Sequence, residues 1–459
     1  MLSALFAPFI KQGPAAVMFH LIAERILAPR RLEALFGATA ERQRTRELLF
    51  STCVDVLGLV VAGRSKSVRA AYLRRRAKTA VGVRALYDKL AGIETCVSER
   101  FVERTATQLA ELVDALGASR SPLLAGYEVR IVDGNYLAGT QHRPLPLRGR
   151  REATLPGLAV AVYDPERRLV RDVLLATDGH LNERTLLPRL LERIVSGQCW
   201  IADRNFATHD FLAGIVARGA AFVIRQHGQT HGTPLGTAKP CGRIAAGELS
   251  ERGLRIDTAS GPLELRQVTL TLAAPNRAAD REVRILTNLP AEISAAQVAE
   301  LYHARWKIET AFMHLATALK SEVDTLAYPQ AALFGFAIGL VLHNILRTLE
   351  AALRAAHPRL TAERLFSLYY LGEEIAEVSR GMLIAIPPQH WRAAADLDDE
   401  AWRKQLLDVA RTVEVKRYFT EPRKKKKSSA KPVLPLAPKA RGGHVATQRI
   451  LDQPKKRKR

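Results

Sequence analysis

The first quarter of the chain carries apolar residues at the spacing of an α-helix. Between Val17 and Leu32, apolar pairs recur every three or four positions, and the sequence is poor in Gly and Pro after Pro29. A helix shows this period when one of its faces packs against a core. We therefore predict a helical N-terminal region over residues 1–120.

Shorter apolar runs, typical of β-strands, replace the helical period after Ser119. The pattern predicts three strands, a helix, a strand, a helix and a strand, over residues 127–132, 158–163, 169–176, 183–194, 200–202, 209–217 and 221–225. Turn residues at 164–168 join the second and third strands as a hairpin. This order is that of an RNase H-like core, although other α/β domains share it.

Residues 228–290 interrupt the α/β pattern with a segment rich in Gly, Thr and turn residues. Strand-like runs at 263–272 and 282–287 predict a β-rich insertion there.

Helices return after the insertion. Ser294 and Gln297 have the spacing of a capping box, which predicts the start of a long helix that ends near Leu319. Further helical periods cover residues 331–354 and 362–371.

These patterns predict an α/β fold in which helical regions flank an RNase H-like, mixed-sheet core. The expected parts are a helical N-terminal region (1–120), the core (121–350) with its β-rich insertion (228–290), a helical C-terminal region (351–415) and a tail (416–459).

The chain is strongly basic, and much of the excess charge lies at the C-terminus. Lys and Arg number 69 against 46 Asp and Glu, a net charge of +23. Residues 416–459 hold 16 basic and 2 acidic residues, so this segment alone carries +14. Its composition predicts a disordered tail. A moderately basic body with such a tail suits a polyanionic partner, most often nucleic acid.

Composition also argues against several classes of protein. The four cysteines lie far apart with no CxxC pair, so neither a disulfide framework nor a cysteine zinc site is expected. The longest apolar run, 331–342, is too short to cross a bilayer and predicts a buried helix. The first residues do not resemble a signal peptide, and we expect a cytoplasmic protein without a membrane partner.

Two aspartates stand at the ends of predicted strands. Asp133 follows the apolar run 129–132, and Asp203 follows the run 200–202. A strand end places a carboxylate at the rim of a sheet, where it can meet a cation. Phosphodiester chemistry uses two divalent ions about 4 Å apart, and Mg²⁺ prefers oxygen ligands. Taken singly, each aspartate is more commonly a turn or capping residue.

A third acidic residue, Glu309, lies in the helix predicted after the insertion. Tyr302, Arg305 and Glu309 are spaced i, i+3 and i+7 and therefore share one helix face. An ordinary surface ion pair between Arg305 and Glu309 would account for part of the same spacing.

Three sequence blocks together resemble a known bacterial family. They are DGNYLAGTQHR at 133–143, ADRNF at 202–206, and LTNLP at 286–290 followed by LYHARWKIETAF at 301–312. In this order, with a β-rich insertion before the last block, they resemble insertion-sequence transposases of the DDE superfamily. The resemblance is to the "insertion sequence four" group, which has a Tyr-x2-Arg-x3-Glu-x6-Lys signature.

The resemblance implies a DNA transposase that catalyses phosphodiester hydrolysis and transesterification. Asp133, Asp203 and Glu309 would be the catalytic triad and would bind two Mg²⁺ ions, for which Mn²⁺ can substitute. Tyr302 and Arg305 would contact phosphates at the transposon ends.

Further expectations concern DNA and partners. Arg143 and Arg204, which follow the two aspartates, are candidate DNA contacts. The partners implied are double-stranded DNA, as inverted-repeat ends and as target, and a second copy of the chain in the synaptic complex. A bacterial, nucleoid-associated location follows from the resemblance, as does recognition of the repeats by the N-terminal helices.

One position departs from the signature. Its final Lys should fall seven residues after Glu309, where this chain has Ala316. Lys320 lies eleven residues after Glu309, about three helical turns further along the same face, and is the candidate replacement.

Two alternatives stay open on the sequence. The chain could be a degenerate or repurposed DNA-binding relative that does not cut, for which Ala316 is the main argument. It could also be a metal-dependent nuclease without strand transfer.

Overall fold

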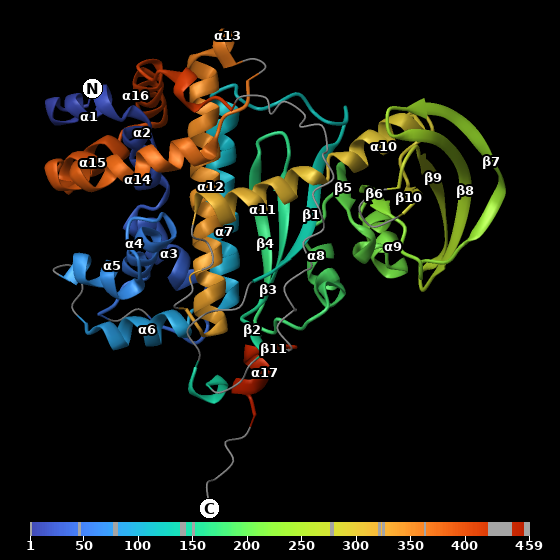
Figure 1. Ribbon diagram of the computed structural model, residues 1–459, viewed down its shortest axis with the longest axis horizontal. Coiled ribbons are helices and arrows are strands. Elements are labelled where there is room, and N and C mark those ends of the chain that lie inside the picture. The colour runs from blue at the N-terminus through green and yellow to red at the C-terminus, as the bar shows by residue number, and fades with distance from the viewer. Residues whose placement is uncertain are drawn as a thin grey trace, which may run out of the picture.

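A mixed sheet of nine strands runs through the part of the chain that the structure describes (Figure 1). This computed structural model describes residues 2–44, 47–76, 81–137, 144–148, 152–275, 280–319, 323, 326–361, 364–420 and 443–453. The strand order is β4-β3-β1-β5-β6-β10-β9-β8-β7. The mixed α/β class predicted from the sequence is therefore confirmed.

The first five strands of this order carry the pattern predicted for the core. They are β1 (Glu128–Tyr136), β3 (Leu158–Asp164), β4 (Leu169–Ala176), β5 (Gln198–Ala202) and β6 (Ala221–Arg225). β4, β3 and β1 are antiparallel, whereas β1, β5 and β6 are parallel. The helix predicted at 183–194 is shorter than expected and consists of η4 (Glu183–Leu186) and α8 (Leu187–Leu191), while α9 (His209–Ala217) has the predicted bounds.

The strands predicted within 228–290 are present, and they continue the same sheet. They are β9 (Gly261–Leu272) and β10 (Glu282–Thr287), and two strands that were not predicted, β7 (Thr233–Ile244) and β8 (Gly247–Thr258), lie beyond them. β10 pairs antiparallel with β6, with Leu286 opposite Ile224. The β-rich segment is therefore the far end of the central sheet and does not form a sheet of its own (Figure 1).

Side chains alternate between the two faces of the sheet, and each face has its own helices. Val132 of β1 packs with α8 and α9 residues such as Leu190 and Phe211. Ile131, one position earlier, belongs to a second core that includes α7 (Thr95–Ala115) and α12 (Pro329–Ala356). This alternation makes a three-layer arrangement of helix, sheet and helix.

Helices from the two ends of the chain pack together beside the second face. The N-terminal elements are η1 (Ala4–Phe6), α1 (Ala7–Gln12), α2 (Pro14–Ile26), α3 (Pro29–Thr39), α4 (Phe50–Val61), α5 (Val68–Arg75) and α6 (Val83–Ala91). The C-terminal ones are α13 (Pro358–Thr361), α14 (Leu368–Ala385), α15 (Pro388–Ala395), α16 (Asp399–Arg411) and η6 (Val415–Tyr418). α2 contacts α14, α15 and α16, so the regions predicted at 1–120 and 351–415 share one core.

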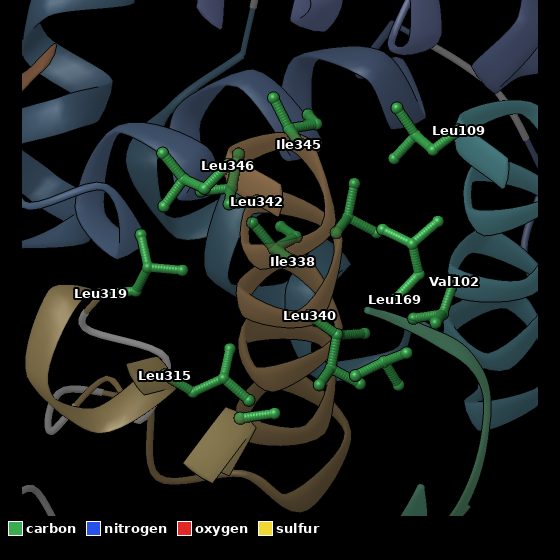
Figure 2. Close-up of a cluster of buried hydrophobic side chains, with 14 of the residues drawn as sticks. Val102, Leu109, Leu169, Leu315, Leu319, Ile338, Leu340, Leu342, Ile345 and Leu346 are labelled. Carbon is green, nitrogen blue, oxygen red and sulfur yellow. The ribbon is translucent and has the colours of Figure 1, made fainter. Parts of the chain in front are cut away.

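Helix α12 lies at the centre of that shared core. It contacts α4, α7, α16 and β4, and Figure 2 shows Ile338, Leu342 and Ile345 of α12 among leucines and valines from neighbouring elements. Its length and composition would suit a membrane span, but its apolar window is entirely buried inside the protein. The buried helix predicted from the run at 331–342 is therefore present.

The helix predicted at 362–371 is wrong in its first part. Phe366 forms an isolated bridge with Phe419 instead. Helix α14 begins at Leu368, where the Ser367 hydroxyl accepts a hydrogen bond from the Tyr370 backbone N–H at 3.3 Å. The apolar period did not distinguish a helix from a segment that pairs with distant chain.

The prediction of a disordered tail over 416–459 is wrong for two short pieces. Tyr418, in η6, is buried. β11 (His444–Ala446) pairs in parallel with β2 (Ala153–Leu155), and α17 (Thr447–Leu451) follows it. Arg449 Nε of α17 lies 2.6 Å from Asp178 Oδ2. Short apolar stretches inside a basic segment pair with distant parts of the chain, whereas the basic runs at 423–427 and 455–459 lie outside the described residues.

A buried carboxylate on α12 ties the helical layer to the sheet. Glu350 is 1% exposed and pairs with Arg168, with Arg347 Nη1 at 2.7 Å and with Arg354 Nη2 at 2.9 Å. Burial favours the neutral acid, but the three arginines outweigh it and lower the pKa of Glu350 from 4.5 to about 2. A group whose pKa is lowered on folding stabilises the fold above its unfolded pKa, and this contribution is lost as the pH falls.

Glu350→Gln should reduce the free energy of unfolding at pH 7 by about 3–5 kcal/mol, because it leaves buried guanidinium groups without their counter-charge. Chemical denaturation followed by circular dichroism measures the change. Glu377→Gln, on the exposed face of α14, is the matched control and should change stability by no more than about 0.5 kcal/mol.

The lowered pKa of Glu350 also predicts how the stability of the two proteins depends on pH. The wild type should lose stability more steeply than Glu350→Gln between pH 4.5 and about 2. This account would be contradicted if the free energy of unfolding fell equally with pH in both proteins. It would also be contradicted if Glu350→Gln lowered the free energy of unfolding at pH 7 by less than about 1 kcal/mol.

Candidate active site

Asp133 and Asp203 lie side by side because β1 and β5 run in parallel. Ile131 of β1 stands opposite Ile201 of β5, and each aspartate comes two residues later. Residues two apart on a strand share a face, and neighbouring strands lie about 4.8 Å apart. The two carboxylates therefore lie on the face of the sheet that α7 and α12 cover.

The local settings of the two aspartates differ. Asp203 directly follows β5, and its Oδ1 accepts a hydrogen bond from the Asn205 N–H at 2.8 Å, which caps η5 (Arg204–Phe206). Asp133 was expected to end its strand, but β1 continues to Tyr136 and Asp133 pairs with Ala161 of β3. Pairing with β3 extends β1 beyond the apolar run from which its end was predicted.

The third acidic residue comes from a pair of helices that lie end to end across the sheet (Figure 1). They are α10 (Ala295–His303) and α11 (Trp306–Ala318). The predicted capping box is present: Ser294 Oγ accepts from Gln297 N–H, and Gln297 Oε1 accepts from Ser294 N–H at 2.9 Å.

The single helix predicted from Ser294 to Leu319 is interrupted at Ala304 and Arg305. Arg305 N–H bonds to Tyr302 O at 3.1 Å and Lys307 N–H bonds to Ala304 O at 3.0 Å, the spacing of a 3₁₀ turn. Both residues keep right-handed helical dihedrals, so the turn tightens the helix without reversing it.

Arg305, at this tightened turn, joins two of the three acidic residues. Its Nη1 lies 3.1 Å from Asp133 Oδ2, and its Nη2 lies 2.6 Å from Glu309 Oε1. The side chains of Arg305 and Asp133 are 12% and 16% exposed, whereas that of Glu309 is 37% exposed. Burial raises the pKa of Tyr302, and the nearby charge of Arg305 acts against this rise. The predicted face of Tyr302, Arg305 and Glu309 is therefore assembled around the guanidinium.

Glu183 is a fourth carboxylate beside the site, which sequence reasoning did not identify. It is 7% exposed, and its Oε2 accepts from Asn205 Nδ2 at 3.2 Å. Gly134 leaves the space that Glu183 fills, since a Cβ at Gly134 would lie 2.0 Å from Glu183 Oε1. The sequence did contain a hint of this contact, because Gly134 directly follows Asp133 and Glu183 begins the helix after β4.

The carboxylates oppose one another's ionisation. Burial is the main cause that raises the pKa of Asp133 to about 7; Arg305 acts against this rise, and Asp203, Glu183 and Glu309 contribute to it. Burial also raises the pKa of Glu183. For Arg305, burial acts against the charged form, but Asp133, Tyr302 and Glu309 outweigh it and raise its pKa. The site holds more negative charge than one arginine balances.

The chemistry of these side chains fits a hard divalent cation, because carboxylate oxygens are the ligands that Mg²⁺ prefers. Their present positions do not form a complete set: among the described residues, no three His, Cys, Asp or Glu side chains are grouped closely enough to hold a metal ion. Arg305 engages oxygens of Asp133 and Glu309 that would otherwise be free to act as ligands.

Two polar hollows share His227, and neither is lined by Asp133, Asp203, Glu183 or Glu309. One, of about 470 Å³, is lined by Tyr136, Arg184 and Asn205 among others. The second, of about 440 Å³, lies along the β-rich end of the sheet and contains three arginines, Arg225, Arg252 and Arg284. Their arginines make this a basic surface, in which Arg225 and Arg284 also pair with Asp280 and Glu282.

The structure describes some of the remaining candidate DNA-binding positions and not others. Arg204 is exposed on η5 next to Asp203. Ala316, at the position of the signature Lys, lies in α11. Lys320 and Arg143 fall outside the described residues.

Gly134→Ala should reduce the free energy of unfolding by about 1–3 kcal/mol, because the added methyl group overlaps Glu183. Denaturation curves measure the loss. Gly381→Ala on α14 has open space around the added carbon and should be neutral or stabilising by up to about 1 kcal/mol. In a Glu183→Ala background the cost at Gly134 should shrink, and an unchanged cost there would show that the methyl group meets something else.

Comparisons with known proteins bear on the segment that holds the site. Residues 124–344 match a family model described as a transposase DDE domain. A search of curated proteins gave no match. Among solved structures, a cryo-EM structure of a piggyBac transposase synaptic complex with hairpin DNA is similar at 11% identity and a TM-score of 0.37, covering 86% of this chain and 85% of that one. At that TM-score the likeness supports no conclusion about the fold.

The matched segment begins shortly before β1 and ends within α12, so it contains Asp133, Asp203 and Glu309. The similarity to a transposase DDE domain therefore covers the part of the chain that carries the candidate site.

Proposed function

We propose that this chain is an insertion-sequence transposase of the "insertion sequence four" group, which cuts and joins DNA with divalent metal ions. The observation that carries the proposal is that Arg305 pairs with both Asp133 and Glu309, while the parallel register of β1 and β5 brings Asp203 next to Asp133. These residues lie inside the segment that matches a transposase DDE domain.

The sheet supports an RNase H-like core for this reaction. Strands β4, β3 and β1 are antiparallel and are followed by β5 and β6 parallel to β1, with helices on both faces. This arrangement places Asp133 on β1 and Asp203 directly after the adjacent strand β5. It also leaves the β-rich end of the sheet beside the site, where it can contact DNA.

Asp133, Asp203 and Glu309 are the proposed metal ligands. When bound, two Mg²⁺ ions would activate the attacking oxygen and stabilise the leaving oxygen of the phosphodiester. The chain itself contributes position and charge: its carboxylates hold fixed places on rigid elements, and Tyr302 and Arg305 orient the phosphate that reacts.

The proposed sequence has two phosphodiester steps. Water first cuts the strand at the transposon end, and the freed 3′-hydroxyl then attacks target DNA in line. The basic surface at Arg184, Arg225, Arg252 and Arg284 suits the DNA backbone, because phosphate contacts fix a protein's register on a duplex. Synapsis of two ends implies a homodimer in the active complex.

Asp133→Asn, Asp203→Asn and Glu309→Gln should each reduce metal-dependent cleavage by at least about 100-fold, the scale of losing one preorganised charge at an active site. The substrate is a labelled duplex with the inverted repeat from the element's own locus, with Mg²⁺ or Mn²⁺. Glu300→Gln, on the exposed face of α10, is the matched control and should retain wild-type cleavage.

The products separate this proposal from its rivals. Cleavage at the repeat boundary followed by joined product supports the transposase. Tight binding of the repeat with no cleavage by the wild type would indicate a repurposed DNA-binding protein, and nicked product that never joins would indicate a nuclease.

A further inference from the structure

One guanidinium occupies the oxygens that a metal ion would need. Arg305 reaches Asp133 Oδ2 with Nη1 and Glu309 Oε1 with Nη2, at 3.1 and 2.6 Å. The other oxygen of Asp133 accepts the Gly134 N–H at 3.1 Å. Both oxygens of Asp133 are therefore engaged by donors from the protein itself.

A divalent ion and Arg305 in this position exclude each other. Mg²⁺ binds carboxylate oxygens at about 2.0–2.1 Å. A lone pair that accepts a hydrogen bond from the guanidinium cannot bind the ion at the same time. Two like charges that are mostly shielded from solvent also repel strongly, because the effective dielectric constant is low there. Loading of an ion between Asp133 and Glu309 therefore requires Arg305 to move.

A phosphate is the ligand best suited to draw Arg305 away. The planar fork of a guanidinium binds phosphate oxygens in pairs, as it binds carboxylates. Arg305 Nε is buried and has no hydrogen-bond partner in its present position, so the present pairing leaves one donor unused. DNA phosphate and the two carboxylates thus compete for one cation.

The surroundings of Arg305 allow such a move. Its guanidinium lies 5.4 Å from the ring centre of Trp306, which is 52% exposed. An aromatic face can hold an arginine that has left its carboxylates. Arg305 also stands at the tightened turn between α10 and α11, where a change at one residue does not disturb a regular helix.

We propose that Arg305 is an internal counter-ion that keeps the site closed to metal until DNA phosphate takes the guanidinium, so that metal binding is coupled to DNA binding. The inference rests on the proposed function and adds regulation to the same site. Coupling of this kind is reciprocal: DNA that raises metal affinity is itself bound more tightly in the presence of metal.

Mn²⁺ binding, followed by electron paramagnetic resonance of the free ion, tests the coupling without any reaction. In the absence of DNA, the Arg305→Met protein should bind Mn²⁺ at least about tenfold more tightly than the wild type, within the usual range of coupling between sites. Arg380→Met, on the exposed face of α14, should bind as the wild type does. Asp133→Asn added to Arg305→Met should remove the gain, which locates the ion.

A second arm uses the wild type alone and does not depend on the folding of any variant. Adding the inverted-repeat duplex should raise its Mn²⁺ affinity by at least about tenfold, and the duplex should have little further effect on Arg305→Met. Equal Mn²⁺ affinity with and without DNA in the wild type would overturn the inference while leaving the proposed function standing. Absence of Mn²⁺ binding in every state would overturn both.

Discussion

Acidic side chains that a sheet and a helix bring to one place need a counter-charge, and Arg305 supplies it. The parallel register of β1 and β5 makes Asp133 and Asp203 neighbours. Burial and the surrounding carboxylates raise the pKa of Asp133 to about 7. Without a cation such a cluster would either take up protons or open. The position of α11 and the closed state of the site both follow from this requirement.

The rest of the fold holds the helix that carries that cation. α11 contacts β1 on one side and α12 and α14 on the other. α12 is in turn fixed by the buried pairing of Glu350 with three arginines and by the apolar contacts in Figure 2. Helices from both ends of the chain thereby keep Glu309 within reach of Asp133, although neither end contributes a side chain to the acidic cluster.

Sequence patterns predicted the features of the fold that depend on neighbouring residues in the chain. β4 and β6 have their predicted bounds because continuous apolar runs between turn residues have few other stable conformations. Asp133 and Asp203 stood out because each follows such a run, and Glu309 stood out by its helical spacing from Tyr302 and Arg305. Glu183 did not stand out, because its place depends on the approach of η4 to Gly134, a contact between segments distant in sequence.

Two further differences between the predicted and the observed elements also arise from features that local patterns do not contain. The tightened turn at Ala304 and Arg305 preserves the direction of the helix and the apolar period, so the pattern could not separate α10 from α11. β11 gains its hydrogen bonds from β2, far earlier in the chain, which the basic composition of the tail does not predict. Local patterns predicted elements, and long-range contacts decided their ends and partners.

The most direct test is the position of the metal ion. Anomalous diffraction at the manganese edge, from crystals of the protein with its inverted-repeat duplex and Mn²⁺, would place the ion and Arg305 in one experiment. We expect an anomalous peak bound to the carboxylates of Asp133 and Asp203, with Arg305 on a DNA phosphate. A peak away from these carboxylates, with Arg305 still paired to Asp133 and Glu309, would contradict the account.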